Sequence, residues 1–309
     1  AIFTLTNNFR KSRLFFTSVM VIVSYAVIYL GMNMIKGGVP ESNGFFDYLL
    51  FAGNGLLVLI SFPLIFLFEQ KFLLISDTTL LMLADPNQPL LRKLAVEAPG
   101  SYQHSLQVAN IAEEAARVIG ANMHLTRTGA LYHDIGKVAN PSYYIENIAD
   151  GVSPHEKLDP RDSAKVIINH VRQGVVLAKN YKIPVQVIDF IRTHHGTSVA
   201  YFFYKKHVDQ NPGEKDNTKA FTYPGPKPFS KETAIVMMAD AVEASSRSLE
   251  KYTEEGISEL VERIMYLQEQ DGQYSDVPLT YKDISDIKSV FKKRLQNIYH
   301  VRVAYPDRI

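Results

Sequence analysis

The chain has 309 residues, of which 46% are hydrophobic, carries a formal net charge of +1 and contains no cysteine. Without cysteine it forms no disulfide, no zinc-thiolate site and no iron-sulfur cluster. A net charge so close to zero gives no reason to expect a nucleic-acid polymer as partner, although a small anionic ligand needs only a local cationic site.

Apolar residues are concentrated in the first seventy positions, in two runs without a charge. The first extends from Leu14 to Ile35 and the second from Tyr48 to Phe68. A helix rises about 1.5 Å per residue, so each run is long enough for the roughly 30 Å hydrocarbon core of a bilayer. The first run is longer than the apolar part of a signal peptide, and no small-residue cleavage site follows it. The sequence therefore predicts a transmembrane hairpin over residues 1–70, with helices at about 14–35 and 46–68.

Charges around the two runs predict the orientation of the hairpin. Its outer ends carry most of the nearby basic residues, namely Arg10, Lys11, Arg13 and Lys71, whereas the connection between the runs contains one, Lys36. Because cytoplasmic segments are enriched in Lys and Arg, both ends are expected in the cytoplasm of a multi-pass bacterial membrane protein. The chain begins with Ala1 rather than Met, and we expect it to be the C-terminal part of a longer protein.

Residues 71–99 are predicted to form two short helices. Ser76 can cap a helix that runs through Leu83, and a second helix covers Leu90 to Ala98, after a proline-containing turn. We interpret this segment as a connector between the hairpin and the following domain. A packing layer on that domain is an equally good interpretation.

From residue 100 to 309 the apolar residues recur with helical period, and strand patterns are scarce. The fold class is therefore predicted to be all-α, with helices near 102–119, 125–135, 161–181, 184–194, 198–208, 231–249, 256–270 and 281–303. Asp159 followed by Pro160, and Pro184, mark helix starts. The last helix carries an apolar stripe that suits the core first and a homodimer surface second: Ile284, Ile287, Phe291, Leu295 and Ile298.

Histidines cluster in the middle of the chain, where seven of the nine lie between positions 104 and 195. Asp240 sits in an apolar stretch, where an unpaired carboxylate would be costly to bury, so it is expected to face a cation. The predicted metal ligands are His104, His133, Asp134, His170, His194, His195 and Asp240. The other histidines, His124, His155, His207 and His300, are expected outside the site, with His155 and His207 at the surface.

The number of ligands fits a pair of metal ions. Two six-coordinate ions offer about twelve positions, and oxygen and nitrogen donors suit iron or manganese. Seven side chains fill eight positions if Asp134 bridges the ions, and a bridging water fills two more. The remainder are open for substrate oxygens, as metal-assisted hydrolysis requires.

The order of these residues, His, then His-Asp, His, His-His and Asp, resembles that of the HD-domain phosphohydrolase superfamily over roughly residues 95–250. The resemblance implies that one ion is held by His104, His133, Asp134 and Asp240. The second would be held by Asp134, His170, His194 and His195.

The sequence around these ligands is similar to that of the seven-transmembrane HD proteins of the PgpH type, which are bacterial cyclic di-AMP phosphodiesterases. The similar stretches are Asp85 to Leu91, Ala98 to Ser105, Ile119 to Asn122, and Tyr132 to Lys137. This resemblance implies an HD-domain helical bundle after two transmembrane helices, and an enzyme that hydrolyses the second messenger cyclic di-AMP to linear pApA with two divalent ions. It also implies a catalytic role for Asp134 and Lys137.

Four residues are candidates for contacting the substrate. Lys137 could bind a phosphate oxygen or protonate the leaving 3′ oxygen, although a lysine at a helix end also stabilises the helix dipole. Arg247 lies on the same helix face as Asp240 and could meet a phosphate, or form an ion pair with Glu243 four residues before it. Tyr223 and Lys227, in the proline-rich segment from Asp209 to Ser230, could stack on a base and bind an anion.

Two alternatives to this function stay open. An HD phosphohydrolase of cyclic di-GMP or of guanosine tetra- and pentaphosphate is the nearest, although the Gly-Tyr-Pro tripeptide of the cyclic di-GMP enzymes is absent between His133 and His170. The other is a non-catalytic nucleotide-binding membrane receptor. The complete ligand set argues against it.

Overall fold

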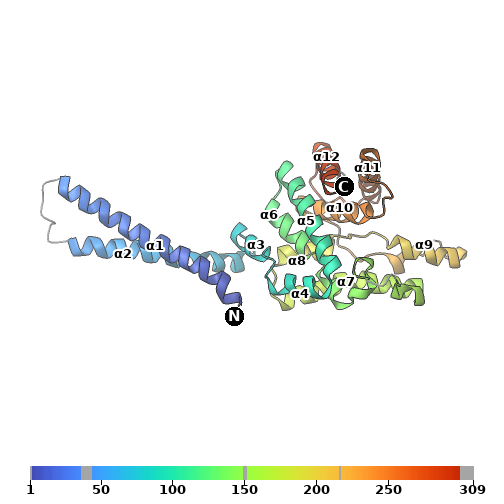
Figure 1. Ribbon diagram of the computed structural model, residues 1–309, viewed down its shortest axis with the longest axis horizontal. Coiled ribbons are helices and arrows are strands. Elements are labelled where there is room, and N and C mark those ends of the chain that lie inside the picture. The colour runs from blue at the N-terminus through green and yellow to red at the C-terminus, as the bar shows by residue number, and fades with distance from the viewer. Residues whose placement is uncertain (1, 36–43, 149–151, 216, 300–309) are drawn as a thin grey trace, which may run out of the picture. The chain divides into compact units, whose positions relative to one another are not determined.

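The computed structural model describes residues 2–35, 44–148, 152–215 and 217–299, without the side chains of residues 2–15, 62, 63, 65, 66 and 70. Within this part the chain is almost entirely helical, and its only β pairing is an isolated bridge between Val199 and Thr222. The predicted all-α class is confirmed (Figure 1). The chain divides into two compact units, Ala1–Leu74 and Ile75–Ile309.

The first unit is a hairpin of two long helices, α1 (Ile2–Ile35) and α2 (Gly44–Phe72). Ser18 Oγ donates a hydrogen bond of 2.5 Å to the carbonyl oxygen of Gly55 across the hairpin. A side chain at position 55 would lie 2.5 Å from Ile22, so glycine permits this close approach. Small residues and hydroxyl-carbonyl bonds of this kind are typical of helix packing in lipid.

The surface of the hairpin favours a membrane environment. Within α1, Phe16–Ile35 is long and apolar enough to cross a bilayer. Val27, Ile28 and Leu57 are each more than 60% exposed, and such apolar surface is unfavourable in water. In α2 the apolar stretch among the described residues is Phe45–Ser61. The predicted span continues beyond Ser61 through positions whose side chains lie outside the described part of the chain. The second span and the cytoplasmic orientation therefore stay predictions.

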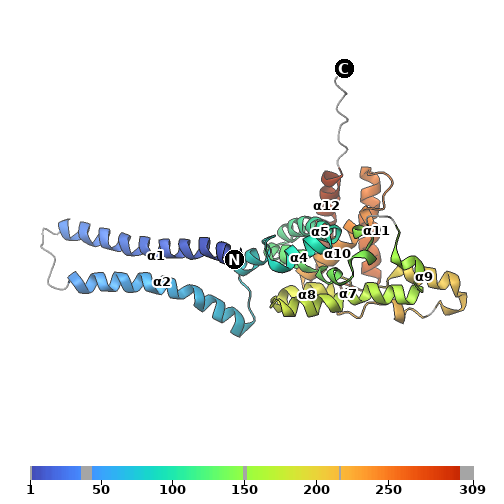
Figure 2. The same cartoon turned by 60° about the horizontal axis from the view of Figure 1, so that its bottom comes forward.

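The second unit contains the remaining helices, which lie close to the predicted positions (Figures 1 and 2). They are α3 (Asp77–Leu83), α4 (Pro89–Glu97), α5 (Pro99–Val118), α6 (Met123–Tyr132), α7 (Pro160–Asn180), α8 (Val185–Thr193), α9 (Tyr201–Gln210), α10 (Lys231–Ser246), α11 (Glu254–Gln270) and α12 (Tyr281–Ile298). Short 3₁₀ helices connect several of them, including η1 (Ile135–Ala139) and η3 (Ile145–Asn147).

Several helix boundaries differ from the prediction by up to five residues, and for two of them the structure shows the reason. The helix predicted to start at residue 198 begins at Tyr201, because Ala200 N donates to Phe221 O at 2.8 Å and the Val199–Thr222 bridge holds the chain extended. The helix predicted to end at residue 135 stops at Tyr132, where the chain tightens into η1. By contrast, α7 starts as predicted, because the Asp159 side chain accepts a hydrogen bond from Arg161 N at 2.8 Å and Pro160 occupies the first turn.

The core of the second unit forms around α5, which packs against α6, α10 and α12. On α12, Ile287, Phe291 and Leu295 are completely buried and Ile284 packs against them, so most of the predicted stripe faces the core, whereas Ile298 at its end is 39% exposed. The segment before α5 belongs to the same core. Its members Leu80, Leu91 and Leu94 are also completely buried, which makes α3 and α4 a packing layer on this unit. A coupling role toward the hairpin stays a prediction.

One close contact offers a test of this packing. Gly129 on α6 faces Phe190 on α8, and a Cβ atom at position 129 would lie 2.3 Å from the buried phenyl ring. We expect Gly129→Ala to lower the free energy of unfolding by about 1–3 kcal/mol through overpacking. Denaturant unfolding of the full chain in detergent, followed by circular dichroism, measures this.

Gly213→Ala is the matched control, because no atom lies within 4 Å of a Cβ built at Gly213. Equal unfolding midpoints for the two variants would contradict the proposed α6–α8 contact.

Candidate metal centre

Five segments of the second unit bring the predicted ligands together. His104 comes from α5, His133 and Asp134 from the junction of α6 and η1, His170 from α7, His194 and His195 from the end of α8, and Asp240 from α10. All are buried except His195, which is partly exposed. The seven residues form two groups around Asp134.

The first cluster contains His104, His133 and Asp240, whose ligand atoms lie within 4.8 Å of one another. His104 Nε2 is 2.9 Å from Asp240 Oδ1, and His133 Nε2 is 3.6 Å from the same oxygen. Two imidazole nitrogens and a carboxylate oxygen therefore face one point. Such a set is suitable for a divalent transition-metal ion.

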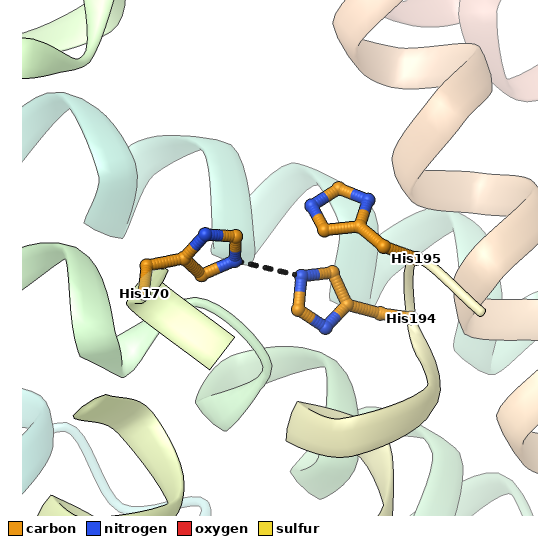
Figure 3. Close-up of side chains that lie close together, drawn as sticks. All are labelled: His170, His194 and His195. Carbon is orange, nitrogen blue, oxygen red and sulfur yellow. Dashed lines mark hydrogen bonds between the residues drawn. The ribbon is translucent and has the colours of Figure 1, made fainter. Parts of the chain in front are cut away.

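The second cluster contains His170, His194 and His195, again with ligand atoms within 4.8 Å of one another. The three rings converge, as Figure 3 shows, and His170 Nε2 lies 3.1 Å from His194 Nε2. Burial lowers the pKa of all three imidazoles, that of His195 to about 3. They are neutral at pH 7, which is the form in which imidazole binds a metal.

Asp134 lies between the clusters and turns one oxygen toward each. Its Oδ2 is 3.4 Å from His133 Nε2, and its Oδ1 is 3.4 Å from His170 Nε2. Burial acts to raise the pKa of this carboxyl, but Lys137 and His133 hold it well below its usual value. The carboxylate is therefore ionised and placed to bridge two ions.

Glycine at position 136 makes this arrangement possible. A Cβ atom there would lie 1.9 Å from the carbonyl oxygen of His170 and 2.6 Å from the backbone nitrogen of Gly174. The absence of a side chain lets η1 lie directly against α7. Asp134, just before η1, is thereby brought next to His170.

Four of the histidines are held by hydrogen bonds at Nδ1. His133, His170 and His194 each use the carbonyl oxygen three residues earlier, at distances of 2.6, 2.6 and 3.0 Å. His104 Nδ1 instead lies 2.5 Å from Glu243 Oε2. A proton on Nδ1 would satisfy each of these acceptors and leave Nε2 to bind a metal, which is the usual support of a metal-binding histidine.

Three buried atoms in the centre have no hydrogen-bond partner; one, Asp134 Oδ2, is in an ion pair with Lys137, which leaves His133 Nε2 and Asp134 Oδ1. Leaving a buried polar atom unsatisfied costs about 1–3 kcal/mol. A cation in each cluster would satisfy both atoms and balance the carboxylates. The residues present therefore fit two divalent metal ions.

Lys137 is the cation nearest to Asp134. Its Nζ lies 2.7 Å from Asp134 Oδ2 and 2.8 Å from Glu146 Oε1. Burial acts to lower its pKa, but these two carboxylates raise it above the ordinary value, so the amine is protonated. Ser101 Oγ donates to the same Glu146 oxygen at 2.8 Å, which fixes η3 against the start of α5.

Comparisons with known proteins agree with this geometry. The family model of the HD domain matches residues 101–245. A solved structure, the phosphodiesterase PgpH HD domain of L. monocytogenes in complex with cyclic di-AMP, is 40% identical and superposes with a TM-score of 0.67 over 70% of this chain and all of its own. This chain belongs to the PgpH family of HD domains.

Two curated relatives are longer than this chain. The cyclic-di-AMP phosphodiesterase PgpH of Bacillus subtilis is 44% identical over 240 residues, which is 78% of this chain and 34% of the relative. The protein of the same name from Listeria monocytogenes is 40% identical over 260 residues, 84% of this chain and 36% of the relative. The chain spans about a third of the length of these relatives.

Glu243, a residue of the HD domain, holds His104 and was not predicted from the sequence. It is 3% exposed and lies one helical turn after Asp240, and this spacing is the signal that could have found it. Arg247 forms the ion pair with Glu243, at 2.6 Å between Nη2 and Oε1. The pair was one of the two expectations for Arg247, and a contact with phosphate stays a prediction.

The other substrate candidates are already engaged within the HD domain. The Tyr223 ring packs against His195 in a tilted arrangement, with 4.2 Å between ring centroids, and Tyr223 is 6% exposed. Lys227 Nζ donates to Gly272 O at 2.8 Å.

The prediction that His155 and His207 lie at the surface is wrong. Aromatic rings of Tyr143, Phe203 and Phe221 cover them. Both lie outside the two clusters.

The bridging position of Asp134 predicts a distinct pattern of metal loss. We expect the purified full chain to hold two ions, His104→Ala to hold one, and Asp134→Ala to hold neither at micromolar free metal, because both clusters lose their shared carboxylate. Elemental analysis after dialysis against a fixed free concentration of Mn²⁺ measures this.

His124→Ala is the control, because His124 belongs to neither cluster, and it should hold two ions. An Asp134→Ala variant that kept both ions would contradict the bridging role.

Proposed function

We propose that this chain is a metal-dependent phosphodiesterase that hydrolyses cyclic di-AMP to linear pApA. The observation that carries the proposal is the position of the Asp134 carboxylate, with one oxygen toward each histidine cluster. The substrate follows from the relatives, which are named cyclic-di-AMP phosphodiesterases, and from the solved HD domain, which is in complex with cyclic di-AMP.

The residues fit two ions of iron or manganese, since their donors are imidazole nitrogens and carboxylate oxygens. One ion would be held by His104, His133, Asp240 and Asp134, and the other by His170, His194, His195 and Asp134. When bound, the ions would lower the pKa of a water and neutralise charge on the phosphoryl group. The residues of the chain fix where this chemistry takes place.

In the proposed hydrolysis a water oxygen forms a bond to one phosphorus, and the bond from that phosphorus to the 3′ oxygen breaks. The 3′ oxygen takes up a proton, and the product is a linear dinucleotide with a 5′ phosphate. Lys137 is the protonated group closest to Asp134 and is 14% exposed, so a donor atom is available at the rim of the centre. It would bind a phosphate oxygen or supply the proton to the leaving oxygen.

We further propose that the hairpin anchors this chemistry to the bacterial cell membrane. The apolar helix Phe16–Ile35 and the exposed apolar side chains of α1 and α2 support a lipid environment. The basic residues at the outer ends of the hairpin support a cytoplasmic HD domain. A cytoplasmic position would give the enzyme access to a nucleotide second messenger.

The substrate assignment is tested by competition. Purified full chain in detergent, loaded with Mn²⁺ or Fe²⁺, is incubated with equal concentrations of cyclic di-AMP, cyclic di-GMP and guanosine tetraphosphate, and the products are separated by chromatography. We expect pApA to form fastest, and Asp134→Ala to form none.

Faster turnover of either guanine nucleotide would contradict the assignment to cyclic di-AMP. Binding without turnover of any of the three would indicate a receptor rather than an enzyme.

The role of Lys137 is tested by Lys137→Met, which keeps most of the side-chain length and removes the charged donor. We expect kcat for cyclic di-AMP to fall about 10²–10⁴-fold, the range typical of a lost acid–base group. Metal content should stay at two ions per chain. Lys292→Met, at an exposed ion pair with Glu262 on the α11–α12 surface, is the control, and a kcat equal for the two variants would contradict the role.

A further inference from the structure

His195 differs from the other histidines of the centre in its support. Among the described residues, neither of its ring nitrogens takes part in a hydrogen bond, and the carboxylate within 4.0 Å of them is that of Asp240, at 3.9 Å from Nδ1 to Oδ2. A metal-binding histidine usually has its second nitrogen bonded to a fixed acceptor, which sets the orientation of the ring. The orientation of His195 must therefore come from its backbone and from ring contacts.

The backbone after His195 is held by Gln273, which lies 76 residues after Thr197 and is 2% exposed. Thr197 N donates to Gln273 Oε1 at 3.1 Å, and Gln273 Nε2 donates to Thr197 Oγ1 at 3.3 Å. At Gly196, which has φ of 50°, a Cβ atom would lie 2.3 Å from Gln273 Oε1. Glycine is needed here for both its backbone angle and this close approach.

The ring of His195 is held from its other side by Tyr223. The two ring centroids are 4.2 Å apart, and Tyr223 N donates to Ser198 O at 2.9 Å. The loop that carries Tyr223 is tied in turn by Lys227, whose Nζ donates to Gly272 O at 2.8 Å. Both supports of His195 therefore lead to the neighbouring residues 272 and 273.

Local sequence makes this anchor rigid. The helix α11 ends at Gln270 and is closed off by Gly272, which has φ of 62°. Gly272 N donates to Glu269 O at 2.8 Å, and Gln273 N donates to Gln268 O at 3.0 Å. This is the glycine-terminated helix end in which a left-handed residue satisfies the last carbonyl groups. It fixes the backbone of Gln273, although the family model matches only residues 101–245.

We propose that Gln273 is a positioning residue for His195 and thereby for the second metal ion. Lys227 contributes by holding the Tyr223 ring against His195, which gives this lysine a positioning role in place of contact with a substrate anion. The inference rests on the metal centre of the proposed function. It adds that the turn between α11 and α12 is part of that centre.

The test measures metal binding rather than turnover. The metal-free full chain in detergent is titrated with Mn²⁺, and free Mn²⁺ is followed by electron paramagnetic resonance. With Gln273→Leu we expect the dissociation constant of one ion to rise about 10–100-fold, as for other lost supports of metal ligands, and that of the other ion to stay unchanged. Gln273→Glu, which keeps an acceptor for Thr197 N, should bind both ions nearly as the unmodified chain does.

Three further variants separate positioning from general loss of structure. His195→Ala should weaken binding of the same ion. Adding Gln273→Leu to His195→Ala should weaken that binding little further, because Gln273 acts through His195. Lys227→Met should weaken that ion to a smaller degree. Gln270→Leu is the control, because Gln270 is exposed at the end of the same helix and its side chain takes part in no hydrogen bond among the described residues. It should leave both ions unchanged.

Three outcomes would overturn the proposal: unchanged binding of both ions by Gln273→Leu, equal weakening by Gln270→Leu, or full additivity with His195→Ala. Its failure is distinguishable from failure of the proposed function. A chain that binds two Mn²⁺ ions but does not hydrolyse cyclic di-AMP would contradict the proposed function alone.

Discussion

The buried carboxylate of Asp134 is the group on which the arrangement of the second unit depends. An ionised carboxylate inside a helical core is unfavourable unless cations or donors surround it. Here Lys137 supplies a cation, and the two clusters of imidazoles would supply a metal ion on either side; these residues come from α5, α7, η1 and the ends of α6 and α8. These elements have to meet at one point. The absence of a side chain at Gly136 lets η1 lie directly against α7.

The supports of the ligands are of two kinds, local and distant. His133, His170 and His194 each bond to a carbonyl oxygen three residues earlier, so the helix that carries the residue also fixes its tautomer. His104 and His195 depend instead on Glu243 and on the Gln273 turn, which are far away in sequence. The local supports form with the helices, whereas the distant ones require the complete fold.

This division explains what could be predicted from the sequence. Helical periodicity predicted the elements within a few residues, and the residue types indicated which side chains would gather in the two clusters, because ionisable groups in apolar settings need partners. The supports could not be predicted. Nothing local marks Gln273 or Glu243 as partners of a histidine, and the burial of His155 and His207 comes from aromatic rings that approach from distant segments.

Negative charge is divided unequally between the two clusters, and this gives the distant supports different roles. The first cluster has Asp240 of its own and has Glu243 directly behind His104, so electrostatic attraction helps to hold an ion there. The second cluster has three neutral imidazoles, and its main negative charge is the shared Asp134. With less attraction available, binding in the second cluster depends more on how accurately the three rings are placed. The ring with the weakest local support is His195, and for this reason the turn at Gly272 and Gln273 matters to the chemistry although it contributes no ligand.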